Sequence, residues 1–167
     1  MSGFFDIPAG PARRPSQGTR MNLSFQEKSL WVMLASLVVG FGFYFANAFG
    51  AHAALAARAP GQAADLMAPY VGLFVAAVIL LVVIAVAGHV VIALAERNPQ
   101  TDERDRLIAL KGTSYASYVL ATGVFLALTA AVFTPGNFIF THVLLAFWVL
   151  AQLVAIGSQL VMYRQGG

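Results

Sequence analysis

Residues 69–94 read PYVGLFVAAVILLVVIAVAGHVVIAL, a stretch without any Asp, Glu, Lys or Arg. A helix needs about 20 consecutive apolar residues to cross the roughly 30 Å hydrocarbon core of a bilayer. This stretch is longer than that. Lipid also forces the backbone N–H and C=O groups to hydrogen-bond within the segment, as they do in a helix. The stretch therefore predicts a transmembrane helix, and with it a membrane protein.

Three further apolar runs accompany this one, at residues 30–49, 114–133 and 138–163. The 167-residue chain is 59% hydrophobic and only 10% charged, whereas a soluble globular domain carries roughly 25% charged residues. The sequence therefore predicts an all-α polytopic membrane protein whose four transmembrane helices form an antiparallel four-helix bundle. We expect a single domain over residues 24–167. Residues 1–23, which are rich in Gly, Pro, Ser and Arg, are expected to be a flexible or extended tail.

The basic residues predict the orientation of the four spans, because Lys and Arg accumulate on the cytoplasmic side of membrane proteins. If the N-terminus is inside, nine of the ten bases lie inside: Arg13, Arg14, Arg20, Lys28, Arg97, Arg104, Arg106, Lys111 and Arg164. Only Arg58 then falls outside, so we expect both termini in the cytoplasm (N-in, C-in). The net charge of +3 is explained by this topology. Nucleic-acid binding is not expected, because no basic face with interleaved aromatic residues occurs.

Sequence signals for helix starts and turns surround the apolar runs. Ser24 and Glu27 match the S-x-x-E capping box ahead of the first run, and the sequence TPGN at residues 134–137 predicts a tight turn. Residues 51–66 are expected to form an outer loop, with a short interfacial helix as an alternative. A cleaved signal peptide is an alternative for residues 30–49, but this run is longer than the signal-peptide core of about 7–15 residues.

Polar side chains within membrane spans are the default candidates for function. Near the outer end, His52 and His142 are expected at similar depth, which is what a haem held by histidines from two facing helices requires. His52 is expected in the loop just past the first span. The reading that we favour is that both histidines lie at the membrane interface and are satisfied by water or loop carbonyls.

Near the inner end, the second polar group consists of His89, Gln159, Tyr115 and Tyr118. His89 and Gln159 are each expected to form an interhelical hydrogen bond worth about 0.6–2 kcal/mol. The alternative is a quinone or lipid-headgroup site completed by Tyr115 or Tyr118. No charged residue falls at mid-membrane, which argues against a proton pump or an ion-coupled transporter. No catalytic residue, metal site or cofactor is expected, because no serine with a base and no H-E-x-x-H pattern occurs.

The segment between the second and third runs, residues 96–112, reads ERNPQTDERDRLIALKG. Asn98 can cap a helix that begins at Pro99, so we expect a short amphipathic helix at the cytoplasmic interface, continuous with the third span or kinked from it. Topology explains the arginines but not the acids, which favours this segment as a docking face for a protein partner. The candidate residues are Asp102, Glu103, Arg104, Asp105 and Arg106. Asp102 and Arg106 have the i,i+4 spacing of a helical ion pair.

The sequence DERDRLIALKGTSYASYVL and the ending QLVMYRQGG resemble a group of uncharacterised small bacterial four-helix inner-membrane proteins, a domain of unknown function. Members of that group carry D-E-R-[DE] before the third helix and end on Tyr-Arg. The resemblance covers about residues 102–120 and 159–166, together with the general layout. It implies a bacterial inner (cytoplasmic) membrane, no known reaction or cofactor, and a cytoplasmic loop that suits a small helix-turn-helix regulator. It transfers as functional positions Asp102, Glu103, Arg104, Asp105 and Arg164.

We therefore expect a non-enzymatic inner-membrane protein that contacts membrane lipid and docks a protein partner, such as a regulator, through residues 96–112. Two alternatives stay open, namely an accessory subunit of a larger membrane complex and a binder of quinone, lipid or haem. Small residues four apart, such as Ser36/Gly40 and Gly123/Ala127, let helix backbones approach closely. They serve either the bundle itself or contact with a second copy, so a homo-oligomer is a further expectation.

Overall fold

The computed structural model describes residues 24–58, 67–95 and 102–165. Helix accounts for 94% of these residues, and none of them forms a strand. The helices are α1 (Phe25–Arg58), α2 (Ala68–Ala95), α3 (Glu103–Phe133) and α4 (Phe138–Arg164). All four are long and apolar enough to cross a membrane, which confirms the predicted all-α fold with four helices of transmembrane length. The predicted tail, residues 1–23, lies outside the described residues.

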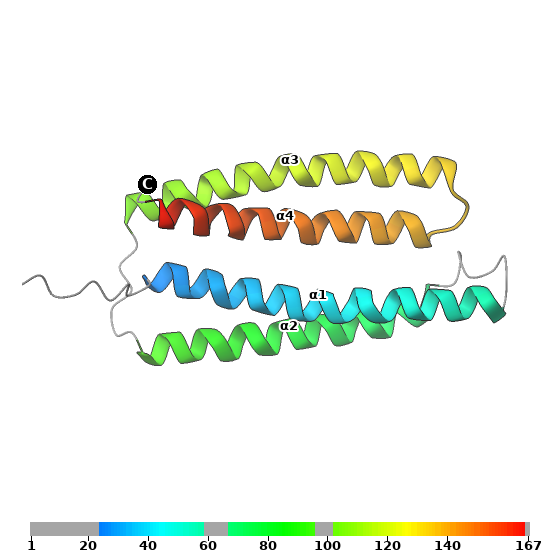
Figure 1. Ribbon diagram of the computed structural model, residues 1–167, viewed down its shortest axis with the longest axis horizontal. Helices are drawn as coiled ribbons and strands as arrows, with labels where there is room; N and C mark the ends of the chain where they lie inside the picture. The colour runs from blue at the N-terminus through cyan, green and yellow to red at the C-terminus, as the bar shows by residue number, and fades with distance from the viewer. Residues whose placement is uncertain (1–23, 59–66, 96–101, 166–167) are drawn as a thin grey trace, which may run out of the picture.

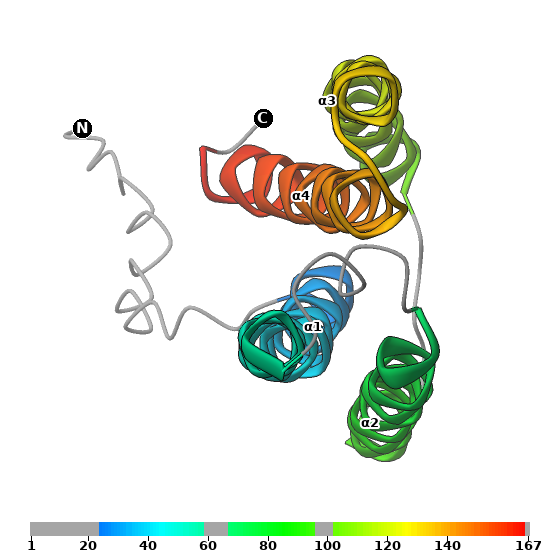
Figure 2. The same ribbon diagram turned by 90° about the vertical axis from the view of Figure 1, so that its right-hand side faces the viewer.

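The four helices are arranged as two pairs. α1 packs along α2, α3 packs along α4, and α1 also contacts α4, which joins the pairs. Figure 1 shows that all four long axes follow nearly the same direction. In the end-on view of Figure 2, α1 and α4 lie in the middle and α2 and α3 lie at the two far edges. No extensive contact joins α2 to α3, so the described helices do not close into a ring.

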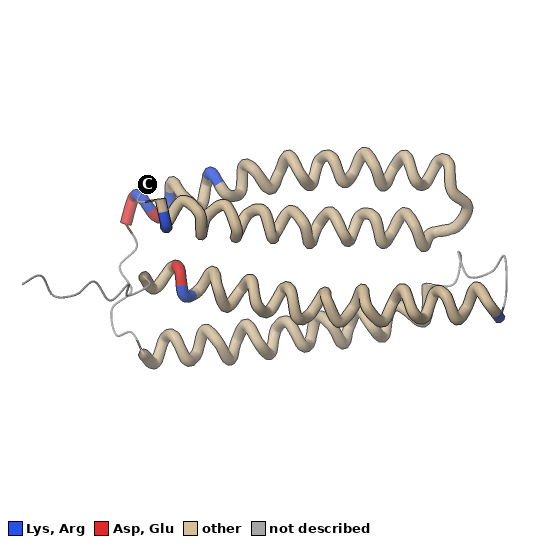
Figure 3. The backbone as a smooth tube through the Cα atoms, viewed as in Figure 1, with Lys and Arg blue, Asp and Glu red and all other residues tan. Residues whose placement is uncertain are grey.

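Most charged residues of the described helices lie at one end of the structure (Figure 3). The residues involved are Glu27, Lys28, Asp102, Glu103, Arg104, Asp105, Arg106, Lys111 and Arg164. Arg58, in the last turn of α1, lies at the opposite end. We call the first end the charged end. The other, which carries the turn between α3 and α4, is the turn end.

Two capping boxes start helices at the charged end. The predicted box of α1 is confirmed, since the Ser24 N–H donates to Glu27 Oε2 (2.9 Å) and the Glu27 N–H donates to Ser24 Oγ (3.2 Å). The second box was not predicted. Asp102 is the N-cap of α3 and accepts from the Glu103 N–H (2.7 Å), while Asp105 Oδ2 accepts from the Asp102 N–H (3.2 Å). Such boxes satisfy backbone donors that have no partner within the helix.

The start of α3 lies within the charged segment. The proposed cap at Asn98 and Pro99 lies outside the described residues, and α3 itself begins at Glu103. From there it runs unbroken to Phe133, so the described part of the charged segment is helix continuous with the third span, which confirms the first of the two predicted forms. The predicted ion pair between Asp102 and Arg106 is wrong, because backbone N–H groups hold the Asp102 carboxylate at the helix start.

The end of α1 corrects the predicted outer loop. Residues 51–58, AHAALAAR, continue α1 as helix, while residues 59–66 lie outside the described part of the chain. Alanine and leucine are strong helix formers, and the first proline after the span is Pro60. His52 therefore lies on a helix and not in a loop. This places its ring at a defined position on the inward face of α1.

Glycines set the close approach of the helices within each pair. A Cβ on Gly112 of α3 would lie 2.8 Å from the backbone oxygen of Ala155 on α4, and one on Gly40 of α1 would lie 3.0 Å from the backbone oxygen of Ala77 on α2. The buried pair Gly123/Ala127 also faces inward. At the turn end, Gly136 has φ 81°, a conformation that glycine adopts without strain. The predicted turn at residues 134–137 is confirmed, since these residues separate α3 from α4.

Candidate functional site: a lateral groove at the turn end

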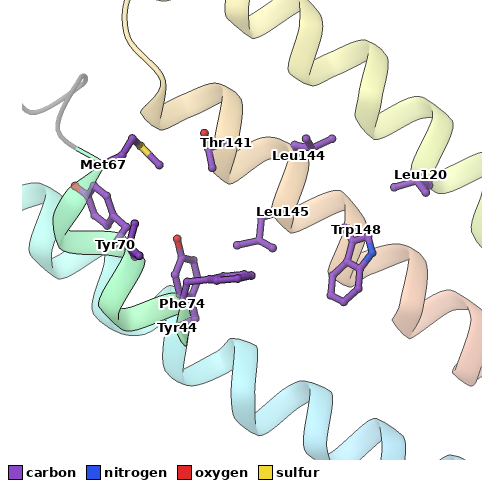
Figure 4. A pocket seen from close by; sticks show the side chains of 10 residues that line it. Tyr44, Met67, Tyr70, Phe74, Leu120, Thr141, Leu144, Leu145 and Trp148 are labelled. Carbon is purple, nitrogen blue, oxygen red and sulfur yellow. The ribbon is translucent and has the colours of Figure 1, made fainter. Parts of the chain in front are cut away.

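A cavity of about 510 Å³ lies between the two helix pairs, toward the turn end. Ten residues line it: Tyr44, Met67, Tyr70, Val71, Phe74, Leu120, Thr141, Leu144, Leu145 and Trp148. Its volume falls within the roughly 300–1,000 Å³ of small-molecule sites. We call it the lateral groove. All four helices or their immediate ends contribute to its walls (Figure 4).

Aromatic rings form much of the lining of the lateral groove. Figure 4 shows Tyr44 and Phe74 beside each other, facing Leu145 across the groove, with Trp148 farther along α4. Tyr44 and Phe74 meet edge to face with ring centroids 6.0 Å apart. Behind them, Phe41 packs edge to face against Trp148 at 5.5 Å. Such aromatic pairs are worth about 0.5–1.5 kcal/mol beyond the area that they bury, so this wall is preorganised.

His142 is buried behind this wall and is held by two hydrogen bonds. Its Nδ1 lies 2.8 Å from the backbone oxygen of Phe138, and its Nε2 lies 3.0 Å from the Tyr44 hydroxyl. A carbonyl oxygen only accepts, so Nδ1 carries the proton and Nε2 accepts from the Tyr44 O–H. His142 is only 5% exposed. Both ring nitrogens of His142 therefore have partners within the protein, a backbone carbonyl and the Tyr44 hydroxyl, rather than water.

His52 belongs to the same cluster. Its ring stacks on Phe138 with centroids 3.6 Å apart, and its Nδ1 lies 3.1 Å from the Tyr70 hydroxyl. Tyr70 in turn meets the His142 ring edge to face at 5.2 Å. The structure thus brings the two predicted outer histidines into one cluster, made of Tyr44, His52, Tyr70, Phe138 and His142. We call it the tyrosine–histidine cluster.

The hydrogen bonds of this cluster bear on haem ligation. A histidine binds iron through the lone pair of a ring nitrogen, and in His142 that lone pair on Nε2 accepts from Tyr44. Ligation would have to break this buried bond. Among the described residues no group of three or more His, Cys, Asp or Glu side chains gathers as a metal site would require. The cluster in this form is a structural element that positions Tyr44 and Tyr70 beside the groove.

Two polar groups of the groove form no hydrogen bond among the described residues, the Thr141 hydroxyl and the indole N–H of Trp148. The hydroxyls of Thr113, Thr122, Thr129 and Thr134 each donate to a backbone oxygen four residues earlier. The Thr141 hydroxyl has no such bond within the described part of the chain, and Thr141 lines the groove. A polar group in an apolar setting without a partner costs several kcal/mol. This hydroxyl is therefore available to a molecule in the groove.

At the charged end, the structure separates the predicted inner polar residues. His89 forms an interhelical hydrogen bond as expected, and its partner is Ser29 of α1 (Nε2 to Oγ, 2.9 Å). Gln159 lies instead over Gly112 of α3. Tyr115 and Tyr118 are 51% and 71% exposed. Neither tyrosine lines the cavity beside His89 or the cavity beside Gln159.

Some side chains of the charged segment hold the start of α3, and others are exposed. Asp102 and Asp105 form the capping box, and Asp105 Oδ1 also accepts from the Tyr163 hydroxyl (2.8 Å). Glu103, Arg104 and Arg106 are exposed. Arg164 lies over the ring of Trp31, with its guanidinium carbon 5.8 Å from the centroid. Two of the three acids that suggested a docking face thus have a structural role in starting α3.

Sequence reasoning missed most of the groove, namely Tyr44, Tyr70, Phe74, Thr141 and Trp148 as a lining set. The spacing of several of the cluster and groove residues in the sequence did indicate that they share helix faces. Tyr44 and His52 are eight apart on α1, while Tyr70/Phe74 and Phe138/His142 are each four apart, so each set falls on one helix face. All of them lie toward the turn end. Their meeting across three helices still depends on how the helices pair.

Comparison with protein-family models, with curated proteins and with solved structures gives no match for this chain, so the argument for its function rests on the geometry of the groove.

Proposed function

We propose that this protein is a non-enzymatic membrane protein that holds a lipophilic molecule in the lateral groove. The observation that carries the proposal is the Thr141 hydroxyl, which has no hydrogen-bond partner in the described part of the chain and lies on a mostly apolar, ring-lined wall. A few placed polar groups on a mostly apolar lining are what orient a small molecule in its site. The tyrosine–histidine cluster supports the role, because it fixes Tyr44 and Tyr70 by hydrogen bonds.

Of the lipophilic classes, an isoprenoid quinone fits the lining best. A planar ring packs favourably against Tyr44, Phe74 and Trp148, and a ring carbonyl accepts from the Thr141 O–H. The aliphatic tail finds Leu144 and Leu145 on the same helix face. An acyl lipid would use the aliphatic part of the groove but not the aromatic part. Bound haem is disfavoured, since the Nε2 lone pair of His142 is already engaged.

Thr141→Val tests this proposal, because valine keeps the shape of threonine and removes the hydroxyl. We expect the purified wild type in mild detergent to retain quinone, and the variant to retain roughly two- to tenfold less. That range corresponds to one hydrogen bond of about 0.5–1.5 kcal/mol. The measurement is solvent extraction followed by mass spectrometry, expressed as quinone per protein.

Thr129→Val is the matched control, since Thr129 is exposed on α3 and its hydroxyl donates to its own helix. It should retain as much quinone as the wild type. The proposal fails if extracts contain only lipids in the proportions of the surrounding membrane. It fails equally if the two valine variants retain the same amount.

A second candidate function is docking of a soluble partner at the charged end. Fewer residues support this function than the sequence predicted. They are Glu103, Arg104 and Arg106, which are exposed on the first turn of α3. A rigid, capped helix start presents these charges in a fixed geometry. A small regulator, as the resemblance implies, is the kind of partner that such a face would suit.

A charge swap of Glu103→Lys with Arg104→Glu tests docking without touching the capping box. We expect it to abolish co-purification of a soluble partner while helicity stays unchanged. Asp102 and Asp105, which hold the helix start, are kept for this reason. Arg58→Glu at the turn end is the control and should leave recovery of the partner intact. Equal recovery with the swap and with the control would rule the docking face out.

We further propose that both termini lie in the cytoplasm of a bacterial cell, with the four helices forming an antiparallel bundle in the inner membrane. The gathering of basic residues at the charged end supports this orientation. The alternative role as an accessory subunit, or as a homo-oligomer, draws support from α2, of which only Tyr70, Ala77 and Ile92 are buried. Contact with membrane lipid accounts for the same exposed surface.

A further inference from the structure

A second cavity, of about 480 Å³, lies at the charged end between α1, α3 and α4. Unlike the lateral groove, it is lined by many polar side chains, which include Ser29, Asp105, Arg106, Thr113, Gln159 and Tyr163. Leu30, Met33 and Ile156 supply its apolar part. We call it the charged-end cavity. Nothing in the proposed role of the lateral groove uses it.

The charged-end cavity contains one anion and one cation that do not neutralise each other. Among the described residues, the Asp105 carboxylate accepts from two neutral donors, the Tyr163 hydroxyl (2.8 Å) and the Asp102 N–H (3.2 Å). The Arg106 guanidinium has no carboxylate or hydrogen-bond partner among the described residues, although it lines the same cavity. A carboxylate and a guanidinium that share a cavity without pairing are complementary to a ligand that carries both charges.

Gln159 adds a hydrogen-bonding amide below these charges. It is half-buried, lines the cavity and has no hydrogen-bond partner in the described part of the chain. Gly112 makes room for it, since a Cβ there would lie 2.7 Å from Gln159 Cγ. On α4 it precedes Tyr163 by one helical turn, or about 6 Å along the axis. That depth matches the layer of roughly 5–8 Å that separates the membrane surface from the hydrocarbon core.

We infer that the charged-end cavity binds a zwitterionic, amine-bearing glycerophospholipid of the phosphatidylethanolamine type. Its ammonium group donates to the Asp105 carboxylate, and its phosphate accepts from the Arg106 guanidinium, a donor that suits phosphate. An ester carbonyl of the glycerol region accepts from the Gln159 amide. The acyl chains leave over Leu30, Met33 and Ile156 toward the membrane. The charges, the hydrogen-bonding groups and the depth of the cavity then all match this one class of lipid.

The test compares lipid retention in nanodiscs that contain equal amounts of phosphatidylethanolamine and phosphatidylglycerol. Lipid bound to the protein after transfer to mild detergent is measured by native mass spectrometry. We expect the wild type to favour the amine-bearing lipid by about ten- to a hundredfold, the range for a hydrogen bond to a charged group. Asp105→Asn should reduce the ratio to that of the nanodisc. Arg106→Gln should weaken retention of both lipids.

Tyr163→Phe is the matched control, because it removes the neutral hydrogen bond to Asp105 and leaves the carboxylate charged. It should keep the preference for the amine-bearing lipid. The inference is overturned if the wild type retains both lipids in the nanodisc ratio, or if Asp105→Asn and Tyr163→Phe lose the preference equally. Displacement of the lipid by millimolar glycerophosphoethanolamine would assign the cavity to a soluble zwitterion and would overturn the membrane source. Thr141→Val, in the lateral groove, should leave the ratio unchanged.

Discussion

Gly123→Ala is expected to lower the free energy of unfolding by about 2–3 kcal/mol, in the upper part of the range for overpacking a core. The new methyl group would fall on Cβ and Cγ of Phe147, on the facing helix α4. Phe147 Cβ is fixed by the backbone, so a change of rotamer cannot move it away. The helices α3 and α4 would have to separate, and with them the wall of the lateral groove. Reversible unfolding in mixed detergent micelles, followed by circular dichroism, measures the change.

Gly157→Ala is the control for the same substitution in the same helix pair. A Cβ on Gly157 meets nothing within 4 Å, and alanine favours helix over glycine by about 1 kcal/mol. We expect this variant to be as stable as the wild type or slightly more stable. If the two alanine variants behave alike, the close approach of α3 and α4 at Gly123 is not the contact that holds the pair together.

Tyr44→Phe is expected to destabilise the protein by about 1–2 kcal/mol. The substitution removes the hydroxyl that donates to His142 Nε2 (3.0 Å) and leaves a buried acceptor without a donor. Hydrogen bonds between membrane helices average about 0.6 kcal/mol and reach about 1.7. We place this one near the upper value because both residues are at least 95% buried, with Tyr44 2% and His142 5% exposed. The same unfolding measurement in detergent applies.

A double-mutant cycle isolates this bond. Tyr44→Phe combined with His142→Phe should be less destabilising than the sum of the two single changes, by about 1 kcal/mol, because the double variant leaves no unsatisfied partner. Tyr118→Phe is the matched control: Tyr118 is 71% exposed, so loss of its hydroxyl should change nothing. Strict additivity in the cycle would show that Tyr44 and His142 stabilise the fold independently.

The spans could be predicted because each is a local property of the chain. Residues 69–94 and 138–163 were predicted to within one or two residues of α2 and α4, since lipid requires a helix wherever the apolar run is long enough. The capping box of Ser24 and Glu27 is equally local and is confirmed. The predicted helix ends were less accurate at the end of α1 and at the start of α3, beyond the apolar runs. α1 continues as helix to Arg58 and α3 already begins at Glu103, because helix propensity and capping, rather than hydropathy, decide those ends.

The pairing of the helices could not be predicted, and the candidate site depends on it. His89 was expected to form an interhelical bond, but nothing in the sequence selects Ser29 as its partner. His52 and His142 were both noted, yet their partners Tyr70 and Tyr44 lie on other helices. Thr141 was not noted at all, because an exposed threonine and one that lines a groove look the same in sequence. These contacts join residues far apart in the chain.

The sequence by itself determined that this chain forms four helices long and apolar enough to cross a membrane and carries its charges mainly at one end. Hydropathy and backbone hydrogen bonding act along each segment separately, so they can be read residue by residue. Only the tertiary structure decided that α1 lies between α2 and α4, that α2 and α3 stay apart, and that the lateral groove and the charged-end cavity remain between the pairs. In lipid no hydrophobic force selects one apolar helix face over another, so that choice rests on close contacts such as Gly123 against Phe147 and on buried bonds such as Tyr44 to His142.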